Sequence, residues 1–363
     1  MKKLFSLFVI AAAVITLTAC GRRADLTVFI PNYYWSQDVI DTFNEEFGVT
    51  VEMRTFDSNE EALIAIHGGA SFDIFVPSDY AIEELANTGR IIPIDWDRIE
   101  LEDDFVWSTQ LEGYLNTLKS GNNGFDLKQY AVPYFWGTVG IIYNNTIPGM
   151  SQRVATEGFG IIGASDLRTV VYNSPRCSMM AAMLRDPSNP QRVYEQTSAT
   201  QFNLAGQWLG QVLSQPNTSL LSDQILSTMP FETPFDAVIA YSGDATWITY
   251  ENSDYSFFNP DNTNVWIDAF TISSRAGTNV DLAYEFLSYM LTFEAAMGGT
   301  EAIFYTSMRQ DVIDEFTEWL IEEGMERSLV AFENVAVTPQ IFRFNDQVKT
   351  WLSDAWLNAL VTS

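Results

Sequence analysis

The sequence contains one histidine, two cysteines and few basic residues, and each shortage excludes a class of protein. With His67 alone the chain cannot build a metal site from paired histidines, and no nucleophile elbow, P-loop or dinucleotide-binding motif joins an expected strand to a helix. Its 19 Lys and Arg residues face 47 Asp and Glu residues, a net charge of -28, which is the wrong sign for neutralising nucleic-acid phosphates. We therefore expect no metal, no cofactor and no nucleic-acid partner.

The composition is that of an acidic globular protein with a large apolar core. Of the 363 residues 47% are hydrophobic and 14% are aromatic, which is enough for two domains of ordinary size. An excess of negative charge attracts cations, although net charge alone cannot locate a site.

The N-terminus predicts export and attachment to a membrane. A short basic start precedes an apolar run at residues 4–17, which is too short to span a bilayer and is typical of a signal peptide. The sequence Leu-Thr-Ala-Cys that ends at Cys20 resembles a bacterial lipobox, which implies cleavage before Cys20 and a lipid on its sulfur. We expect a signal peptide at 1–19, a tether at 20–25, and an extracytoplasmic protein held at the cell membrane. Cys177 then has no disulfide partner.

Apolar strand-like runs alternate with amphipathic segments along the chain. This alternation predicts an α/β fold with a mainly parallel sheet, in which ligands bind beyond the carboxyl ends of the strands. The expected strands are 26–30, 49–53, 74–76, 170–172, 237–241 and 264–272. The expected helices are 36–48, 58–66, 78–89, 174–184, 201–213, 282–291 and 346–360.

Aromatic and acidic residues occur together at four expected strand ends. An ammonium group over an aromatic face gains about 0.5–2 kcal/mol, and a carboxylate adds charge-assisted hydrogen bonds. The groups therefore favour a small organic cation, although an aromatic residue at such a place often packs in the core and an acid often caps a helix. The four groups are Tyr33-Tyr34, Ser78-Asp79-Tyr80, Tyr241-Ser242-Gly243-Asp244 and Trp266-Ile267-Asp268.

With these residues the chain resembles the periplasmic spermidine/putrescine-binding proteins of polyamine ABC importers. The resemblance covers nearly all of the mature chain. It implies a two-lobed periplasmic-binding-protein-like fold of type II, in which two crossing hinge strands join the lobes and the ligand lies between them. The matching motifs are Phe56-Asp57-Ser58-Asn59-Glu60-Glu61, Phe72 to Tyr80, Val132 to Thr138, Tyr241 to Ala245, and Trp266-Ile267-Asp268.

The same resemblance implies an arrangement of lobes and partners. Lobe 1 would comprise 26–135 and 264–310, and lobe 2 would comprise 136–263 and 311–363, with hinges near 133–140 and 260–266. The protein would be a monomer and not an enzyme. Its partners would be a polyamine and the membrane permease of an ABC importer.

The resemblance also implies a set of ligand-binding residues. Trp266 would stack on the alkyl chain, Asp268 would bind an ammonium group, and Asp244 matches an acid of putrescine-binding members. The full set is Tyr34, Ser78, Tyr80, Tyr241, Asp244, Trp266, Asp268 and Tyr305.

The chain departs from the family pattern at four positions. Pro31 stands in place of a tryptophan, and Tyr33 in place of an acid found in some members. Ser174 and Cys177 replace an aspartate and a glutamate that help to hold the ligand. Fewer acids hold fewer ammonium groups, so we expect putrescine to be preferred over spermidine.

Two alternatives remain at this stage. The chain could be a binding lipoprotein of the same fold for a sugar, thiamine or ferric iron, with the adjacent tyrosines Tyr33 and Tyr34 as iron ligands. It could also be a lipid-anchored hydrolase that uses two of its many carboxylates, as glycosidases do.

Overall fold

One mixed sheet joins eleven strands in the part of the chain that the structure describes. The computed structural model describes residues 24–363 except 121–122, 189–197, 222–233, 276 and 334, so the expected signal peptide and Cys20 lie outside the described residues. The strands are β1 (Leu26–Pro31), β2 (Val51–Phe56), β3 (Ile74–Phe75), β4 (Val132–Asn144), β5 (Thr169–Tyr172), β6 (Thr218–Leu221), β7 (Ala237–Tyr241), β8 (Tyr255–Phe258), β9 (Asn264–Ile272), β10 (Thr306–Ser307) and β11 (Gln340–Ile341).

The sheet is parallel at its two ends and antiparallel in the middle. Its order is β2-β1-β3-β9-β4-β7-β5-β6, with parallel pairs β2-β1-β3 at one end and β7-β5-β6 at the other. Strands β9 and β4 pair antiparallel with each other and with their outer neighbours. The expectation of a mainly parallel sheet is therefore wrong for the centre, because two long strands of opposite direction run there.

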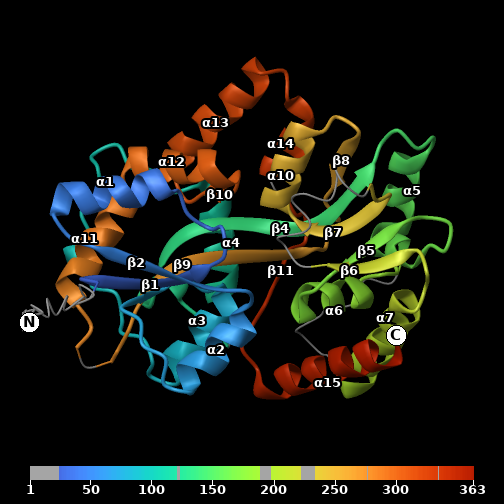
Figure 1. The fold of residues 1–363 in the computed structure, drawn as a ribbon, viewed down its shortest axis with the longest axis horizontal. Helices are drawn as coiled ribbons and strands as arrows, with labels where there is room; N and C mark the ends of the chain where they lie inside the picture. The colour runs from blue at the N-terminus through green and yellow to red at the C-terminus, as the bar shows by residue number, and fades with distance from the viewer. Residues whose placement is uncertain (1–23, 121–122, 189–197, 222–233, 276, 334) are drawn as a thin grey trace, which may run out of the picture.

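Strands β4 and β9 connect the two halves of the molecule. The first half of β4 pairs with β9, and its second half, from Val139 to Asn144, pairs with β7 and β8. Figure 1 shows both strands crossing the middle of the molecule between the two groups of parallel strands. This is the curled α/β sheet of a two-lobed fold with two crossing strands, as the resemblance implied.

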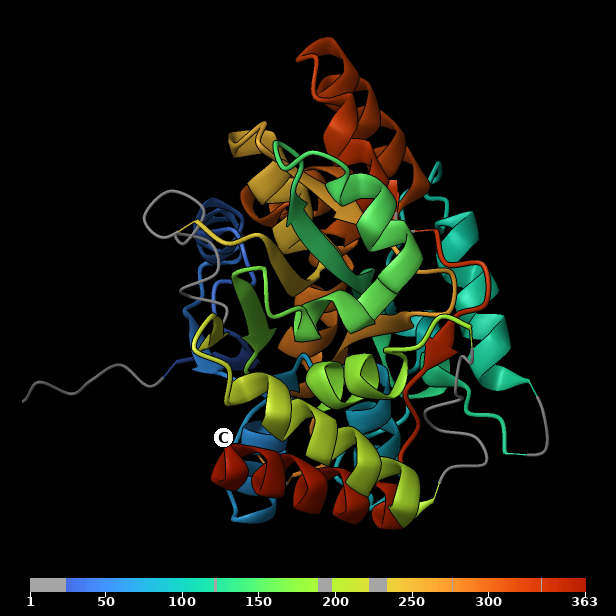
Figure 2. The ribbon, with the colours of Figure 1, turned by 90° about the vertical axis from the view of Figure 1, so that its right-hand side faces the viewer.

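Helices cover both halves of the sheet. Figure 2 shows α15 lying along α7, and these two helices are in extensive contact. The helices are α1 (Gln37–Phe47), α2 (Asn59–His67), α3 (Asp79–Asn87), α4 (Thr109–Lys119), α5 (Met150–Glu157), α6 (Pro175–Met183), α7 (Ala199–Leu213), α10 (Ser242–Glu251), α11 (Val280–Met290), α12 (Phe293–Ile303), α13 (Gln310–Glu322), α14 (Glu326–Glu333) and α15 (Asp346–Thr362).

Local signals in the sequence explain where several helices begin and end. The Ser58 hydroxyl accepts a hydrogen bond from the backbone N–H of Glu61 and caps α2, at the start of the helix expected from residue 58. Gly48 ends α1 in the left-handed region at φ 65°, where a side chain would be strained. Ser36 precedes α1 as expected, but its side chain makes no capping hydrogen bond.

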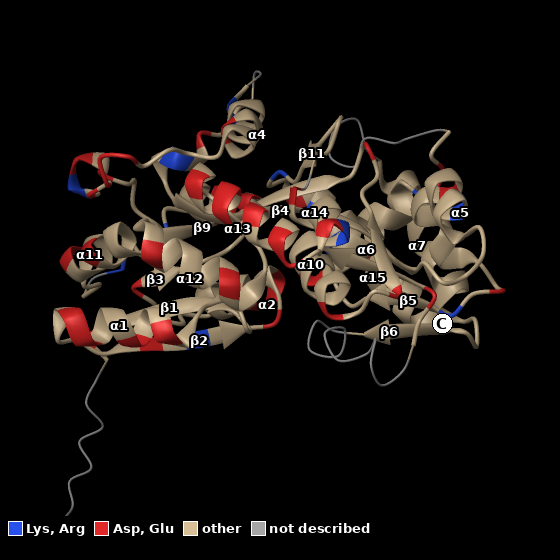
Figure 3. Cartoon of the chain, turned by 90° about the horizontal axis from the view of Figure 1, so that it is seen from above, with Lys and Arg blue, Asp and Glu red and all other residues tan. Residues whose placement is uncertain are grey.

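The excess of acid is spread over the surface of the helices. Figure 3 shows Asp and Glu on α1, α11 and α13, with few Lys or Arg beside them. Within the described ranges, no helix is both long and apolar enough to cross a membrane.

Candidate ligand-binding cavity

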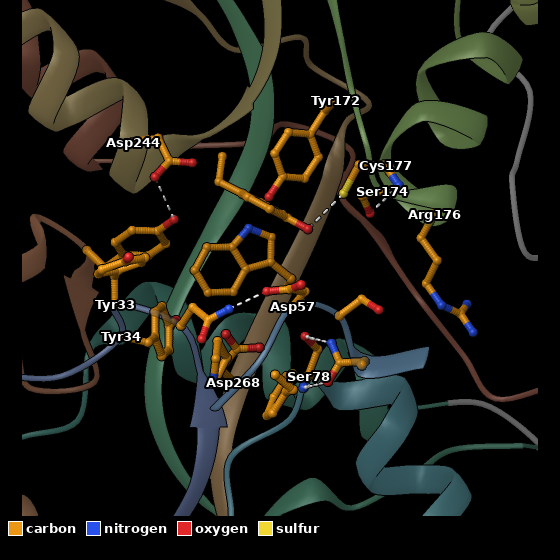
Figure 4. Close-up of a pocket in the computed structure, with 18 of the residues that line it drawn as sticks. Tyr33, Tyr34, Asp57, Ser78, Tyr172, Ser174, Arg176, Cys177, Asp244 and Asp268 are labelled. Atoms are coloured by element: carbon orange, nitrogen blue, oxygen red, sulfur yellow. Dashed lines mark hydrogen bonds between the residues drawn. The ribbon is translucent and has the colours of Figure 1, made fainter. Parts of the chain in front are cut away.

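A cavity of about 660 Å³ lies among strand ends and helix starts from both halves of the sheet. Its walls include every residue that the sequence proposed for the ligand: Tyr34, Ser78, Tyr80, Tyr241, Asp244, Trp266, Asp268 and Tyr305. Figure 4 shows Asp244 and Arg176 on opposite sides of this cavity. The structure thus brings the predicted residues together, and their contact with a ligand stays a prediction.

Asp268 places a buried carboxylate in the cavity wall. It lies in β9, where it forms an antiparallel bridge with Ser78 at the start of α3, and only 7% of it is exposed. Burial raises the pKa of Asp268 to about 6, while the nearby hydroxyls of Ser78 and Tyr34 lower it. The Tyr34 hydroxyl falls short of hydrogen-bond geometry, so Tyr34 Oη and Asp268 Oδ1 are both buried without a partner.

Asp244 supplies a second buried carboxylate in the first turn of α10. The Tyr305 hydroxyl donates a hydrogen bond of 3.2 Å to its Oδ1, and its Oδ2 is buried without a partner. Burial raises the pKa of Asp244 to about 7, and the Tyr305 hydrogen bond only partly offsets this rise. An unpaired buried carboxylate oxygen is costly, and each of the two acids has capacity left for one more hydrogen-bond donor.

Aromatic rings form a continuous wall between the two acids. The ring of Trp266 meets Tyr241 edge to face at 5.7 Å between centroids and meets Tyr305 at 5.5 Å. Tyr305 in turn meets Tyr34 at 5.3 Å. The indole Nε1 of Trp266 donates to the Thr138 carbonyl at 3.3 Å, which fixes the orientation of the ring. Rings held in this way offer apolar and π-electron surface to an alkylammonium chain.

Two glycines allow these rings to lie against the backbone. A Cβ at Gly243 would lie 2.1 Å from the Tyr305 ring, and a Cβ at Gly137 would lie 2.5 Å from the Trp266 ring. Both distances are far below van der Waals contact. The wall therefore depends on glycine at these positions in α10 and β4.

Asp79 lines the same cavity, but both of its carboxylate oxygens already accept hydrogen bonds from the backbone. Its oxygens accept the backbone N–H of Tyr80 at 2.6 Å and of Ile267 at 3.2 Å. Burial nevertheless raises the pKa of Asp79 well above its usual value. This acid joins the start of α3 to β9 and holds the neighbouring Asp268 in place.

The arginine end, which we define as Glu60, Tyr80, Arg176 and Phe342, closes the other side of the cavity. Arg176 Nε donates to Glu60 Oε1 at 2.8 Å, and the Tyr80 hydroxyl donates to the same oxygen at 3.1 Å. The guanidinium carbon lies 3.5 Å from the Tyr80 ring centroid and 5.8 Å from that of Phe342. Sequence analysis missed Arg176, because a basic residue near a helix start carries no sign of its distant partners.

The positions that depart from the family pattern show varied surroundings. Tyr33 is 73% exposed and has a left-handed backbone at φ 56°. The Ser174 hydroxyl caps α6 by accepting from the backbone N–H of Cys177. The Cys177 thiol donates to the Tyr241 hydroxyl at 3.0 Å, and burial raises its pKa to about 11, so the thiol stays protonated.

In the described part of the chain, no three His, Cys, Asp or Glu side chains gather as ligands for an ion. His67 lies 3.0 Å from Glu84, which also binds Lys349. The two tyrosines considered for iron diverge in environment, since Tyr34 is 6% exposed while Tyr33 is mostly in solvent.

Curated relatives share parts of this chain. The putrescine-binding periplasmic protein SpuD of Pseudomonas aeruginosa is 28% identical over 141 residues, which are 36% of this chain and 36% of the relative. The chain therefore matches little more than a third of that relative's length. The putrescine-binding periplasmic protein PotF of Escherichia coli is 24% identical over 314 residues, 80% of this chain and 79% of the relative.

Solved structures share the whole fold. A putative spermidine/putrescine ABC transporter from Listeria monocytogenes superposes with a TM-score of 0.71 at 24% identity, covering 93% of this chain and 99% of the other. Thiaminase I from Bacillus thiaminolyticus superposes with a TM-score of 0.62 at 16% identity, covering 93% and 99%. At such identities the likeness shows the fold alone. A family model for bacterial extracellular solute-binding proteins matches residues 38–323. With its curled two-lobed sheet and central cavity, the chain belongs to this family of bacterial extracellular solute-binding proteins.

Proposed function

We propose that this chain is the substrate-binding component of an ABC importer and captures a polyamine, with putrescine preferred over spermidine. One observation carries the proposal: two buried carboxylates, Asp244 and Asp268, line one cavity, and one oxygen of each is buried without a hydrogen-bond partner. A diamine brings one ammonium group to each acid, and each new ion pair offsets the cost of burying the carboxylate. The putrescine-binding names of the relatives agree with this chemistry.

The aromatic wall suits the middle of such a ligand. Trp266 and Tyr305 lie between the acids and offer flat apolar surface to a chain of methylene groups. A neutral sugar would gain from the rings but would leave the carboxylates without a cation. The charge of the site therefore favours an amine over a sugar.

Capture would proceed by closure of two lobes. We take residues 26–135 with 264–310 as one lobe and 136–263 with 311–363 as the other, hinged in β4 and before β9. Asp268 and Asp244 belong to different lobes on this division, so a ligand that pairs with both favours the closed state. The closed monomer would present its ligand to the permease, tethered outside the cytoplasm through the lipid on Cys20, and no chemical turnover is involved.

Calorimetric titration of the purified chain tests the proposal. Putrescine should bind one to one, and more tightly than spermidine, with thiamine and maltose as controls. The same ligands in a thermal-shift assay provide a second measurement, because a ligand that binds only the folded state raises its stability. Binding of a sugar or thiamine in the absence of any amine binding would overturn the proposal, and cleavage of chromogenic glycosides would point to a hydrolase.

A further inference from the structure

One cation site in the cavity is already occupied by the protein itself. The arginine end offers a carboxylate, Glu60, beside an aromatic face, Tyr80, and these are the features that bind an alkylammonium group. Arg176 fills that place: its guanidinium stacks on the ring at 3.5 Å and donates to the carboxylate at 2.8 Å. Its side chain is only 5% exposed, so the position is enclosed.

We infer that Arg176 is a specificity-determining residue, a built-in cation that limits the ligand to two ammonium groups. The inference rests on the proposed function. Two acids with unpartnered oxygens, Asp244 and Asp268, remain for the ligand, while Glu60 is already paired. A third ammonium group directed toward the arginine end would find the Glu60 carboxylate already held by the Arg176 guanidinium, so it would lack a carboxylate of its own. A diamine has no third ammonium group to place there.

The position of Arg176 also explains why its charge is hard to displace. It is the second residue of α6, and its contacts Glu60 and Tyr80 begin α2 and α3 in the other half of the molecule. Breaking the Glu60 pair would take from the enclosed Arg176 guanidinium the carboxylate that balances its charge, which is costly for a buried ion. A triamine would have to bear that cost or leave its own third ammonium group unpaired.

Arg176→Met tests the inference, because it removes the charge and keeps most of the stem. The measured quantity is the ratio of the spermidine Kd to the putrescine Kd by calorimetry. We expect this ratio to fall at least about tenfold in Arg176→Met, as Glu60 becomes available to a third ammonium group. Arg176→Lys keeps the charge and should keep the wild-type ratio. Adding Glu60→Gln to Arg176→Met should abolish the gain for spermidine.

Arg185→Met is the matched control. Arg185 also lies over an aromatic ring, that of Trp208 at 5.5 Å, but it does not line the cavity. Its loss should leave the ratio unchanged. An unchanged ratio in folded Arg176→Met, with putrescine still bound, would overturn this inference and leave the proposed function intact. If the wild-type protein binds neither putrescine nor spermidine, the proposed function and this inference are both wrong. If Arg176→Met does not fold, a changed Kd ratio in Arg176→Lys would equally overturn the role of the Arg176 charge.

Discussion

The two ends of the cavity use the same kinds of residue in opposite ways. At the carboxylate end, which we define as Tyr34, Asp244, Asp268 and Tyr305, two acids lack a cation and have raised pKa values. At the arginine end, Glu60 is held by Arg176 and Tyr80. The contrast shows that an acid beside a ring marks a ligand site only if the protein provides no cation of its own. Sequence motifs cannot make that distinction, because the paired residue comes from elsewhere in the chain.

Acidification should produce the largest change in the Kd for putrescine, because it protonates the two acids of the carboxylate end. Asp244 and Asp268, with pKa values of about 7 and about 6, are ionised at pH 8 and mostly protonated at pH 5. Each ammonium group needs an ionised acid, so the Kd for putrescine should rise on the order of a thousandfold between pH 8 and pH 5. Calorimetry at constant ionic strength measures this rise. A constant Kd would place the ligand away from both acids.

The stability of the ligand-free protein should change with pH in the opposite sense. A carboxyl group whose pKa is raised by folding stabilises the folded state below its unfolded pKa, and this stability is lost as the pH rises through the folded pKa. The contribution of Asp244 and Asp268 to the free energy of unfolding should therefore fall from about pH 4 to about pH 7. The difference between wild type and the Asp244→Asn/Asp268→Asn variant in urea unfolding isolates this contribution.

Asp268→Asn should produce the next largest effect. It removes one charge from the carboxylate end and should weaken putrescine binding by more than about 1.5 kcal/mol, or roughly tenfold in Kd. The control is Asp57→Asn, because Asp57 lines the same cavity but is exposed, and its loss should change the Kd little. Wild-type affinity in Asp268→Asn, measured by calorimetry, would remove Asp268 from the site.

Tyr80→Phe should produce the smallest effect on binding. It removes the hydroxyl that donates to Glu60, while Arg176 still holds that carboxylate. We expect the Kd for putrescine to change less than about threefold and the free energy of unfolding to fall by about 1 kcal/mol. Calorimetry and urea unfolding measure the two values. A loss of affinity as large as that of Asp268→Asn would erase the contrast between the ends.

Much of the fold was predictable from the local sequence pattern, and the errors in that prediction have local causes. The strand expected at 264–272 is confirmed as β9, and it is buried along its whole length. The local pattern around Pro133 and Gly137 did not predict a strand, because proline and glycine usually interrupt strands. The stretch forms part of β4, and only the family resemblance had placed a hinge there. The strand expected at 237–241 is confirmed as β7, and Ser242-Gly243-Asp244, which follow it, begin α10.

The candidate site was predictable to the extent that it lies at strand ends. Tyr241, the last residue of β7, follows from the rule that ligands bind beyond the carboxyl ends of strands. Asp268 lies in the middle of β9, not at its end, and was assigned to the site through the family resemblance. The Glu60–Arg176 pair could not be found in this way, since 116 positions separate its members and neither helix signals the other. Pairing of this kind arises from tertiary packing, and only the three-dimensional structure reveals it.

Gly243 limits the substitutions that this protein can tolerate near its cavity. The Tyr305 ring rests on its backbone, and the next residue carries the carboxylate that Tyr305 touches. Even alanine would push the ring away from its acid, although position 243 has no side chain to offer a solute. A survey of tolerated substitutions would therefore find position 243 as sensitive as a residue that touches the ligand. Related proteins that acquire a different ligand would have to do so through substitutions that keep this glycine.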